Sequence, residues 1–405
     1  MVNRREFLRQ STWGLFLAGT SWGHLFQDDF VFPSIPSDQY GNIWVMESAP
    51  GAEVIINGRR CIYFGGTGYF GLQGNAELIK AGIEAFKQYG LHIATSRTGF
   101  GNNPVLLNVE KKIASFFGTE DAVYLASGYL SNLILVQGLA DRYERIFMDE
   151  TAHFSIRDAV YSVRKPVITF AHRDPEDLEK KLQAELKPKE RPLVISDGLF
   201  PTFGLVAPVD EYAKIIEPYA GLICLDDAHA VGVLGPNGRG TYDHFGLQGE
   251  GLYFGGTLSK AFGGFGGFVP GKKEFLDRVR VSVGVYSGAS PTPTPVTAAT
   301  LKAIELVSTH PEWREKLRQN VAFVKAGMRR LGFEVGDSPV PIVTWTMKTA
   351  EEMKKIQREL FERGIALAYL KYIGAPAGGV LRASIFSTHT KAHLEKLLTE
   401  LQRLL

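Results

Sequence analysis

Cysteine is scarce in this sequence. The two cysteines, Cys61 and Cys224, lie far apart and both sit in apolar runs. Two isolated thiols argue against a disulfide framework or a cysteine-rich metal site, so both are expected to be buried. An excess of charge of one sign is lacking as well, because the 45 Lys and Arg residues are nearly balanced by 43 Asp and Glu residues, which gives a net charge of +2. Without a long Lys/Arg run, the composition predicts no nucleic-acid partner.

Long apolar runs are also missing, and no stretch after the N-terminus is a transmembrane candidate. Residues 1–26 contain a twin arginine, Arg4-Arg5, then Phe7-Leu8 and a short apolar stretch. This pattern resembles a twin-arginine export signal, although no A-x-A cleavage site follows. The alternative is the N-terminal arm of a cytoplasmic enzyme. Both an exported or membrane-associated location and a cytoplasmic one therefore stay open.

The rest of the chain is rich in short apolar runs that alternate with amphipathic helical patterns from about residue 120. Helical crossovers between buried strands are typical of parallel sheets, which predicts a large α/β domain with helices on both faces. We expect an N-terminal arm and hairpin over 27–60, the large domain over 61–295, and a smaller α+β domain over 296–405. The predicted strands of the large domain cover 121–127, 145–150, 166–172, 192–198, 221–227, 251–257 and 263–269.

Polar side chains follow several of these predicted strands. Asp226 and His229 end or follow one strand, His153 lies just beyond another, and Ser127-Gly128-Tyr129 opens a helix after a third. Lys260 stands among glycines and aromatic residues in "YFGGTLSKAFGGFGGFV", residues 253–269. In open parallel sheets, ligands bind at the carboxyl ends of the strands, and a helix start favours an anion. The sequence therefore places these groups at one site.

A carboxylate, two histidines, an anion-binding helix start and an isolated lysine suit a phosphate-bearing aldehyde cofactor, pyridoxal phosphate. Lys260 would form the Schiff base, made nucleophilic by desolvation. Asp226 would keep the pyridine nitrogen protonated, which makes the ring an electron sink. A metal site formed by Asp226, Asp227 and His229 is the alternative, but the neighbouring lysine and the lack of a further ligand predict no metal. Asp227 is expected to brace the strand end.

Five segments resemble the α-oxoamine synthase family of fold-type-I pyridoxal-phosphate enzymes, and the likeness runs from about residue 40 onward. They occur in order and at the family's separations. The segments are "SRTGFG" (96–101), "ASGYLSN" (126–132), "DDAHAVGVLGPNGRG" (226–240), "GTLSKAFGGFGG" (256–267) and "LRASIFSTHT" (381–390). The resemblance implies a large domain with a mainly parallel seven-stranded sheet and a smaller C-terminal domain.

The resemblance also implies residue roles. Lys260, His229, Asp226 and His153 match the catalytic set: Schiff-base lysine, ring-oxygen histidine, pyridinium partner and ring-stacking histidine. Arg382 matches the arginine that clamps the carboxylate of the amino acid, for which a guanidinium fork is well shaped. The further cofactor contacts that it implies are Ser127, Gly128, Tyr129, Thr257 and Ser259, and the further substrate contacts are Thr67 and Arg97.

Members of this family condense an amino acid with an acyl-CoA thioester, lose carbon dioxide and form an α-aminoketone. They are homodimers with the site at the subunit interface, and residues 285–290 would reach the phosphate of the neighbour. The biotin-type reaction of 8-amino-7-oxononanoate synthases is the default expectation. Glycine C-acetyltransferase-like and serine palmitoyltransferase-like members are alternatives, as are an aminotransferase or lyase and a non-catalytic partner subunit.

The chain departs from the family pattern at three places, and the resemblance implies that all three lie near the bound substrate. Thr67 replaces an asparagine, Leu106 replaces a histidine, and Pro201-Thr202-Phe203 replaces a serine-methionine-aspartate segment. None of these changes removes a group of the cofactor site. They leave the acyl donor and the amino acid undecided.

Overall fold

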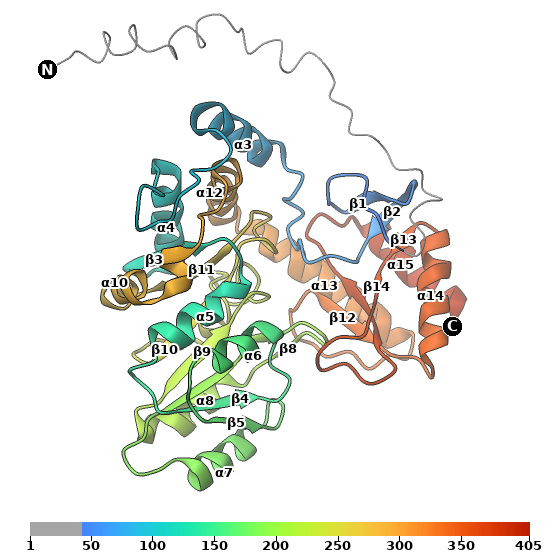
Figure 1. Ribbon diagram of the computed structural model, residues 1–405. Coiled ribbons are helices and arrows are strands. Elements are labelled where there is room, and N and C mark those ends of the chain that lie inside the picture. Colours follow the sequence, from blue (N-terminus) through green and yellow to red (C-terminus); the bar gives the residue numbers. More distant parts are fainter. Residues whose placement is uncertain (1–42) are drawn as a thin grey trace, which may run out of the picture. The chain divides into compact units, whose positions relative to one another are not determined.

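The computed structural model describes residues 43–405, of which 46–405 form one compact unit (Figure 1). The twin-arginine segment and most of the predicted N-terminal arm lie outside the described residues. Within the described part, no helix is both long and apolar enough to cross a membrane.

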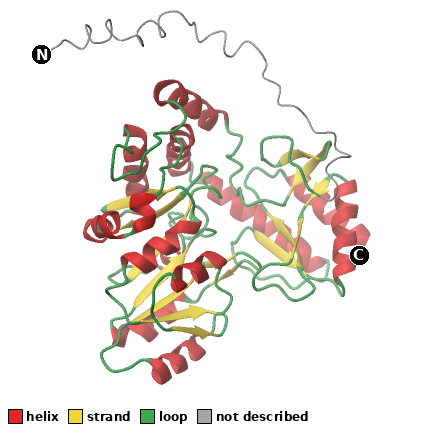
Figure 2. Cartoon of the chain, viewed as in Figure 1, coloured by secondary structure: helices red, strands yellow, loops and turns green. Residues whose placement is uncertain are grey.

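A seven-stranded sheet organises the first two thirds of the described chain (Figure 2). Its strand order is β3-β11-β10-β9-β6-β4-β5, and all neighbours from β10 to β5 run parallel. The mainly parallel seven-stranded sheet expected from the sequence is thus confirmed. The strands are β3 (Asp121–Leu125), β4 (Arg145–Asp149), β5 (Val167–Phe170), β6 (Pro192–Asp197), β9 (Leu222–Asp226), β10 (Leu252–Thr257) and β11 (Gly267–Gly271).

Strand β11 differs from its prediction, because it begins at Gly267 rather than at Gly263 and runs antiparallel to both neighbours. The segment between β10 and β11 contains no crossover helix, so the chain can only return beside β10 in the opposite direction. The glycine-rich part before β11 is instead a tight loop, in which Leu258 N–H donates to the Gly266 carbonyl at 2.9 Å. This loop carries Lys260.

Helices cover both faces of the sheet because strand residues alternate between two apolar layers. Leu193 and Ile195 of β6 pack with one set of helices, whereas Val194 between them packs with the other. The first layer contains α5, α6 and α10, and the second contains α7 and α8. Such alternation with both faces apolar is what a sheet enclosed by helices requires.

The helices begin and end where the sequence gives local signals. Asp174 caps α7 by accepting the Asp177 N–H at 3.0 Å, with Pro175 at the first helical position. The helical stretch after residue 293 is divided in two around His310-Pro311. The helices are α3 (Ala76–Tyr89), α4 (Pro104–Phe117), α5 (Tyr129–Gly138), α6 (Phe154–Tyr161), α7 (Pro175–Glu185), α8 (Val209–Ile216), α9 (Thr241–Phe245), α10 (Lys273–Ser282), α11 (Gly284–Gly288), α12 (Thr294–Thr309), α13 (Glu312–Arg330), α14 (Ala350–Glu362) and α15 (Lys391–Leu404), with a 3₁₀ turn at Glu217–Tyr219.

Three small sheets complete the fold. The predicted hairpin is present, and its Asn57-Gly58 turn has φ values of 48° and 72°, as a two-residue hairpin turn requires. The C-terminal sheet has the order β12-β15-β14 and carries Arg382 on its central strand. The strands are β1 (Glu53–Ile56), β2 (Arg59–Tyr63), β7 (Leu199–Phe200), β8 (Leu205–Val206), β12 (Ile342–Trp345), β13 (Ile365–Ala366), β14 (Ala368–Leu370) and β15 (Val380–Ser384).

A buried ion pair fixes the segment before α4 to the sheet. Both terminal nitrogens of Arg97 donate to Glu110 of α4, at 3.1 and 2.9 Å, and Glu110 also accepts the Tyr124 N–H of β3 at 3.0 Å. Both side chains are less than 10% exposed. A buried pair of this kind is costly to break on one side only.

We expect Glu110→Ala to lower the free energy of unfolding by about 3–5 kcal/mol, because it leaves the Arg97 charge buried without its partner. Urea denaturation followed by circular dichroism measures this. Glu84→Ala, which removes an exposed i,i+3 pair with Lys87 on α3, is the control and should cost less than about 1 kcal/mol. Equal losses in the two variants would contradict the structural role given to Glu110.

Candidate active site

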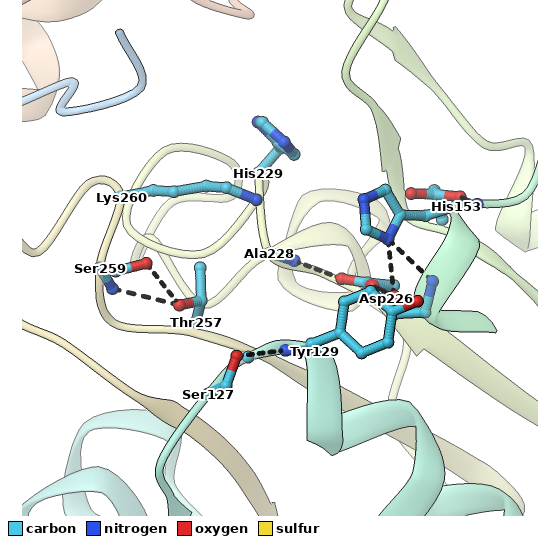
Figure 3. Close-up of a pocket in the computed structure, with 12 residues that line it drawn as sticks. Ser127, Tyr129, His153, Asp226, Ala228, His229, Thr257, Ser259 and Lys260 are labelled. Carbon is cyan, nitrogen blue, oxygen red and sulfur yellow. Dashed lines mark hydrogen bonds between the residues drawn. The ribbon is translucent and has the colours of Figure 1, made fainter. Parts of the chain in front are cut away.

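A pocket of about 220 Å³ opens at the carboxyl edge of the seven-stranded sheet (Figure 3). Strands β3, β6, β9 and β10 all point their carboxyl ends at this edge, which is why residues far apart in sequence meet here. Every residue that the sequence analysis named as a cofactor contact lines the pocket. The lining consists of Ser127, Gly128, Tyr129, His153, Ser155, Asp197, Asp226, Ala228, His229, Thr257, Ser259 and Lys260.

One end of the pocket is built for an anion. Ser127 and Gly128 directly precede α5, so the positive end of this helix lies at the pocket, where the Tyr129 N–H donates to Ser127 Oγ at 3.2 Å. Across from them, the hydroxyls of Thr257 and Ser259 lie 2.8 Å apart. Gly128 makes the close approach feasible, because a Cβ at this position would lie 2.6 Å from the Thr257 Cβ. Backbone N–H groups and two hydroxyls at a helix start match a phosphate.

Asp226 ends β9 at the bottom of the pocket and is held by three donors. Its Oδ2 accepts from Asn132 Nδ2 at 2.7 Å and from Ser155 Oγ at 3.2 Å, while its Oδ1 accepts the Ala228 N–H at 3.0 Å. The side chain is only about 5% exposed. These contacts fix the orientation of a carboxylate that can accept a hydrogen bond from a ring N–H.

Lys260 follows β10 and extends across the pocket toward His153 and His229 (Figure 3). Burial lowers its pKa to about 8; the Arg382 charge acts in the same direction, and the carboxylates of Asp226 and Asp197 oppose the shift. Between residues 43 and 405, no carboxylate lies close enough to its amine to form an ion pair. An amine that is neutral near pH 8 is a nucleophile and a base.

The two histidines are held by side chains that the sequence analysis did not name. Tyr69 Oη lies 2.9 Å from His229 Nδ1, and both residues are buried. His153 Nδ1 lies 2.6 Å from Ser155 Oγ, and its Nε2 lies 2.7 Å from Tyr372 Oη. Burial lowers the pKa of both histidines; at His153 the Asp226 charge opposes the shift, and the charge of Lys260 adds to it at both rings, so the neutral form is favoured.

Asp197 is a second carboxyl group in the pocket that sequence reasoning missed. It ends β6 beside Asp226, and its Oδ2 accepts the His153 N–H at 2.9 Å. Burial and the neighbouring Asp226 charge raise its pKa well above the ordinary value. The signal was available, because Asp197 ends a predicted strand as Asp226 does. By contrast, the partners Ser155, Tyr69 and Tyr372 had no such signal.

The three predicted substrate contacts are not part of the pocket lining. Arg382 is about 9% exposed; one terminal nitrogen donates to the Pro201 carbonyl at 3.2 Å, and its buried Nε has no partner. Arg97 is occupied by Glu110 and Asn102 and lies over the Tyr286 ring. The Thr67 carbonyl accepts the Tyr69 N–H at 3.0 Å. Of the three, Arg382 alone has a buried side-chain donor without a partner.

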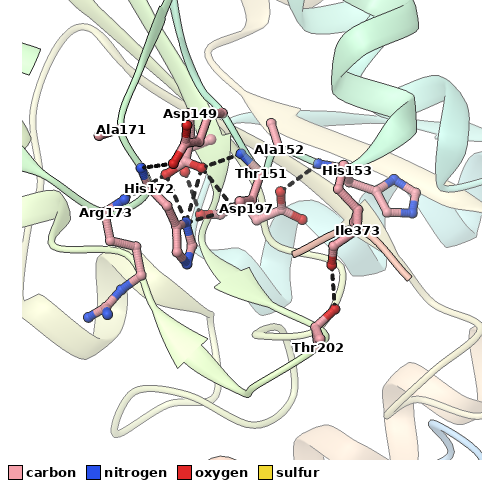
Figure 4. A network of polar contacts seen from close by, with 12 residues as sticks. Asp149, Thr151, Ala152, His153, Ala171, His172, Arg173, Asp197, Thr202 and Ile373 are labelled. Carbon is pink, nitrogen blue, oxygen red and sulfur yellow. Dashed lines mark hydrogen bonds and ion pairs between the residues drawn. The ribbon is translucent and has the colours of Figure 1, made fainter. Parts of the chain in front are cut away.

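The departures from the family pattern have structural consequences. Leu106 is fully buried in the core of α4, so it packs rather than faces a ligand. Thr202 is also buried; its hydroxyl donates to the Ile373 carbonyl at 2.6 Å (Figure 4), and its own carbonyl accepts from Thr344 Oγ1 at 2.7 Å. The changed segment 201–203, which lies between β7 and β8, is therefore tied to the C-terminal sheet through Thr344 and to the β14–β15 loop through Ile373.

Two other aspartates at strand ends, Asp149 and Asp227, stabilise the neighbouring loops by accepting hydrogen bonds from them. Asp149 of β4 accepts from Thr151 Oγ1 at 2.9 Å and from the Arg173 N–H at 2.9 Å, and His172 lies 3.1 Å away (Figure 4). Asp227 accepts the N–H and the hydroxyl of Thr241 at 2.8 and 2.6 Å, which anchors α9. Asp227 thus braces the strand end, as expected. Among residues 43–405, no three His, Cys, Asp or Glu side chains are grouped to hold a metal ion.

Comparison with known proteins agrees with this geometry. The model of the class I and II aminotransferases matches residues 61–401. The 8-amino-7-oxononanoate synthases of Thermosipho melanesiensis and Thermoanaerobacter pseudethanolicus are each 34% identical to this chain over 90% of it, and over 93% and 92% of their own lengths. A structure of a serine palmitoyltransferase variant from S. paucimobilis, bound to pyridoxal phosphate and myriocin, matches with a TM-score of 0.84 at 29% identity, over 89% of this chain and 92% of that one.

The chain belongs to the α-oxoamine synthases within the class I and II aminotransferase family. Pyridoxal phosphate is the cofactor of this family, and the pocket fits it at three points. The helix start with Gly128 and Thr257 suits the phosphate, Asp226 suits a protonated ring nitrogen, and the Lys260 amine suits the aldehyde. These three requirements are met within one cavity.

The depressed pKa of Lys260 predicts how the protein takes up its cofactor. Below pH 8 the amine is protonated and unreactive, and above pH 8 it is neutral, so the uptake rate should rise with pH and level off above about 8. Stopped-flow absorbance after adding pyridoxal phosphate to cofactor-free protein, between about pH 6 and 10, measures this rate. A rate that still climbs at pH 10 would indicate an ordinary lysine.

Lys260→Ala should abolish the visible absorption band of the lysine-bound cofactor. Lys272→Ala is the matched control, since Lys272 is an exposed lysine paired with Glu250 at 2.6 Å. That variant should keep both the band and the pH profile.

Proposed function

We propose that this enzyme is a pyridoxal-phosphate-dependent acyltransferase that condenses L-alanine with pimeloyl-CoA, as an 8-amino-7-oxononanoate synthase does. The observation that carries the proposal is the meeting of Lys260, Asp226 and an anion-binding helix start in one pocket. The relatives named 8-amino-7-oxononanoate synthase, which match over nine tenths of the chain, support the choice of substrates. Their product has nine carbons, which equal seven from a pimeloyl group and two from alanine after loss of its carboxylate.

The residues divide the reaction between them. Bound pyridoxal phosphate supplies an electron-withdrawing ring next to the α-carbon of the amino acid. Lys260, whose pKa is about 8, is suited to remove the α-proton as a general base and to return a proton later. Asp226, fixed by Asn132 and Ser155, would hold the ring nitrogen in its protonated form. His229, neutral and oriented by Tyr69, can donate to an oxygen on the ring or on the acyl group.

Arg382 is the group we assign to the carboxylate of the amino acid. It is a buried guanidinium on β15, and within the described part of the chain it forms no ion pair. Its Nε has no hydrogen-bond partner, which is costly for a buried charged group unless a ligand supplies the acceptor. A carboxylate can engage such a fork in a bidentate manner.

A second candidate is a longer acyl donor with L-serine, because the serine palmitoyltransferases match the fold with a TM-score of 0.84. The segment at Pro201–Phe203 and the buried Leu106 distinguish this chain from the family pattern without deciding between donors. An aminotransferase or lyase would act without a thioester, and a non-catalytic subunit would not need the reactive Lys260.

The test is a matrix of L-alanine, glycine and L-serine against pimeloyl-, acetyl-, succinyl- and palmitoyl-CoA. We expect L-alanine with pimeloyl-CoA to release free CoA fastest, measured by thiol titration, and to give an aminoketone of the expected mass. Lys260→Ala should lower this rate by at least about 10³-fold, since it removes the general base and the cofactor attachment. Amino-group transfer to a keto acid without any thioester would overturn the acyltransferase assignment.

We further propose that the enzyme is a homodimer joined through the exposed face of α3. Ile79, Ile83 and Phe86 of this helix are 50%, 40% and 43% exposed, and Leu91 just beyond it is 61% exposed. A contiguous apolar patch of this kind marks a protein interface, and a second copy is the most economical occupant. The predicted partner contact at residues 285–290 would complete the neighbouring site.

Ile83→Glu should convert the dimer to a monomer, because a charge is placed in the apolar interface, and should lower the turnover number by at least about tenfold. Sedimentation velocity and the CoA-release assay report the two effects. Tyr161→Glu, on α6 and 72% exposed, is the control and should stay dimeric and active. A wild-type monomer that is fully active would refute the shared site.

A further inference from the structure

The segment between β2 and α3 lies against the loop that carries Lys260. We call residues 64–73 the strap, which belongs to the blue part of the chain that leads from β2 to α3 in Figure 1. Its last residue, Gln73, is half-buried, and its side chain contacts the backbone of the lysine loop. Gln73 belongs to none of the five segments on which the family resemblance rests.

Gln73 holds the Lys260 carbonyl from outside the loop. Its Nε2 lies 3.1 Å from the Lys260 carbonyl oxygen and 3.4 Å from the Ser259 carbonyl oxygen. Carbonyl oxygens can only accept, so the NH₂ end of the amide is the group that faces them, and chemistry alone fixes the orientation of the amide. Among residues 43–405, no other side chain forms a hydrogen bond with the Lys260 backbone.

Glycines let the strap and the lysine loop lie in direct contact. The Gly263 N–H donates to the same Lys260 carbonyl at 3.0 Å, which makes a tight turn in which Gly263 has a φ of 69°. A Cβ on Gly263 would lie 2.5 Å from the Leu72 Cβ of the strap, and a Cβ on Gly68 would lie 2.4 Å from Gln73 Oε1. The contact between the two segments therefore requires glycine at both places.

The strap is itself anchored at other points. The Phe64 carbonyl accepts the Ser384 N–H of β15 at 2.8 Å, so the strap is attached to the C-terminal sheet. Tyr69 Oη lies 2.9 Å from His229 Nδ1. Through Tyr69 and Gln73, the strap thus contacts two groups of the pocket, the ring of His229 and the backbone of Lys260.

The position of the Lys260 backbone matters most after the amino acid has displaced the lysine from the cofactor. While the lysine is attached, its side chain is held at both ends. Once the amine is free, only the backbone of residue 260 and the walls of the pocket determine where the amine lies. A general base must lie within hydrogen-bond distance of the proton that it removes, so a fixed backbone at this residue favours proton removal.

We propose that Gln73 is a positioning residue for Lys260, whose amide fixes the Lys260 carbonyl and so keeps the free amine within reach of the α-proton of the amino acid. The inference rests on the proposed function, because it takes an amino acid to be the substrate. Gln73 is not among the residues that line the pocket, so it acts through Lys260 and not by touching the substrate.

The test uses Gln73→Met, which keeps the length of the side chain and removes its donor. Exchange of the α-proton of L-alanine in deuterium oxide, followed by NMR on the cofactor-loaded enzyme without acyl-CoA, should slow about tenfold or more, because a small displacement of the base is costly. The pH at which cofactor uptake by the cofactor-free protein reaches half its plateau should rise above about 8, since an amine held less firmly in its buried position regains water and a higher pKa.

Gln357→Met on α14 is the matched control, because Gln357 Nε2 also donates to a backbone carbonyl, that of Leu367 at 3.0 Å. It should keep the exchange rate and the pH midpoint of the wild type, although both variants lose a hydrogen bond. The thermal midpoints show that the variants are folded, and Gln73→Ala should give the same two changes as Gln73→Met. If Gln73→Met behaves as the control does in both measurements, the proposal is overturned. A wild type that does not exchange the α-proton of L-alanine would overturn the proposed function, whereas the uptake profile would still test the hold of Gln73 on Lys260.

Discussion

The carboxylate of Asp226 is the contact on which the rest of the site depends. Asn132 from α5, Ser155 from α6 and the Ala228 N–H after β9 all donate to it. Hydrogen bonds to this one carboxylate therefore connect three segments at the edge of the sheet. Its negative charge also faces Lys260 and partly offsets the burial that lowers the lysine pKa. Without a fixed charge at this point, neither the ring of the cofactor nor the amine would have a defined electrostatic environment.

A second constraint is the number of ionisable groups that share one small cavity. Asp197 lies beside Asp226 and its pKa is raised, whereas His153 and His229 are neutral because burial and the lysine charge lower their pKa values. When the surroundings of two titratable groups shift their pKa values in opposite directions, one group is suited to act as an acid and the other as a base. The pocket therefore contains one carboxylate positioned as an acceptor, a second carboxyl group whose pKa is raised, and an amine whose pKa is about 8.

Much of this arrangement was predictable from sequence because it follows from strand ends. Asp226, His229 and Lys260 each sit just after an apolar run, and parallel topology brings such positions together. Tyr69, Ser155 and Tyr372 were not predictable, since their roles depend on side-chain directions across distant segments. Arg97 shows the converse, because its motif suggested a ligand contact whereas Glu110 occupies it. The strand β11 was misplaced because alternating glycine and phenylalanine resemble a strand, although the first part forms the lysine loop.

The tie between Thr202 and Ile373 has a consequence for the order in which the enzyme matures. The cofactor contacts lie between residues 127 and 260, whereas Tyr372 and Arg382 belong to the last part of the chain to be synthesised. Since domains fold as synthesis proceeds from the N-terminus, the sheet can close before β15 and Arg382 have emerged from the ribosome. The pocket formed by residues 127–260 and the strand that carries Arg382 are thus completed at different times, and Arg382 takes its place only when the final strand docks.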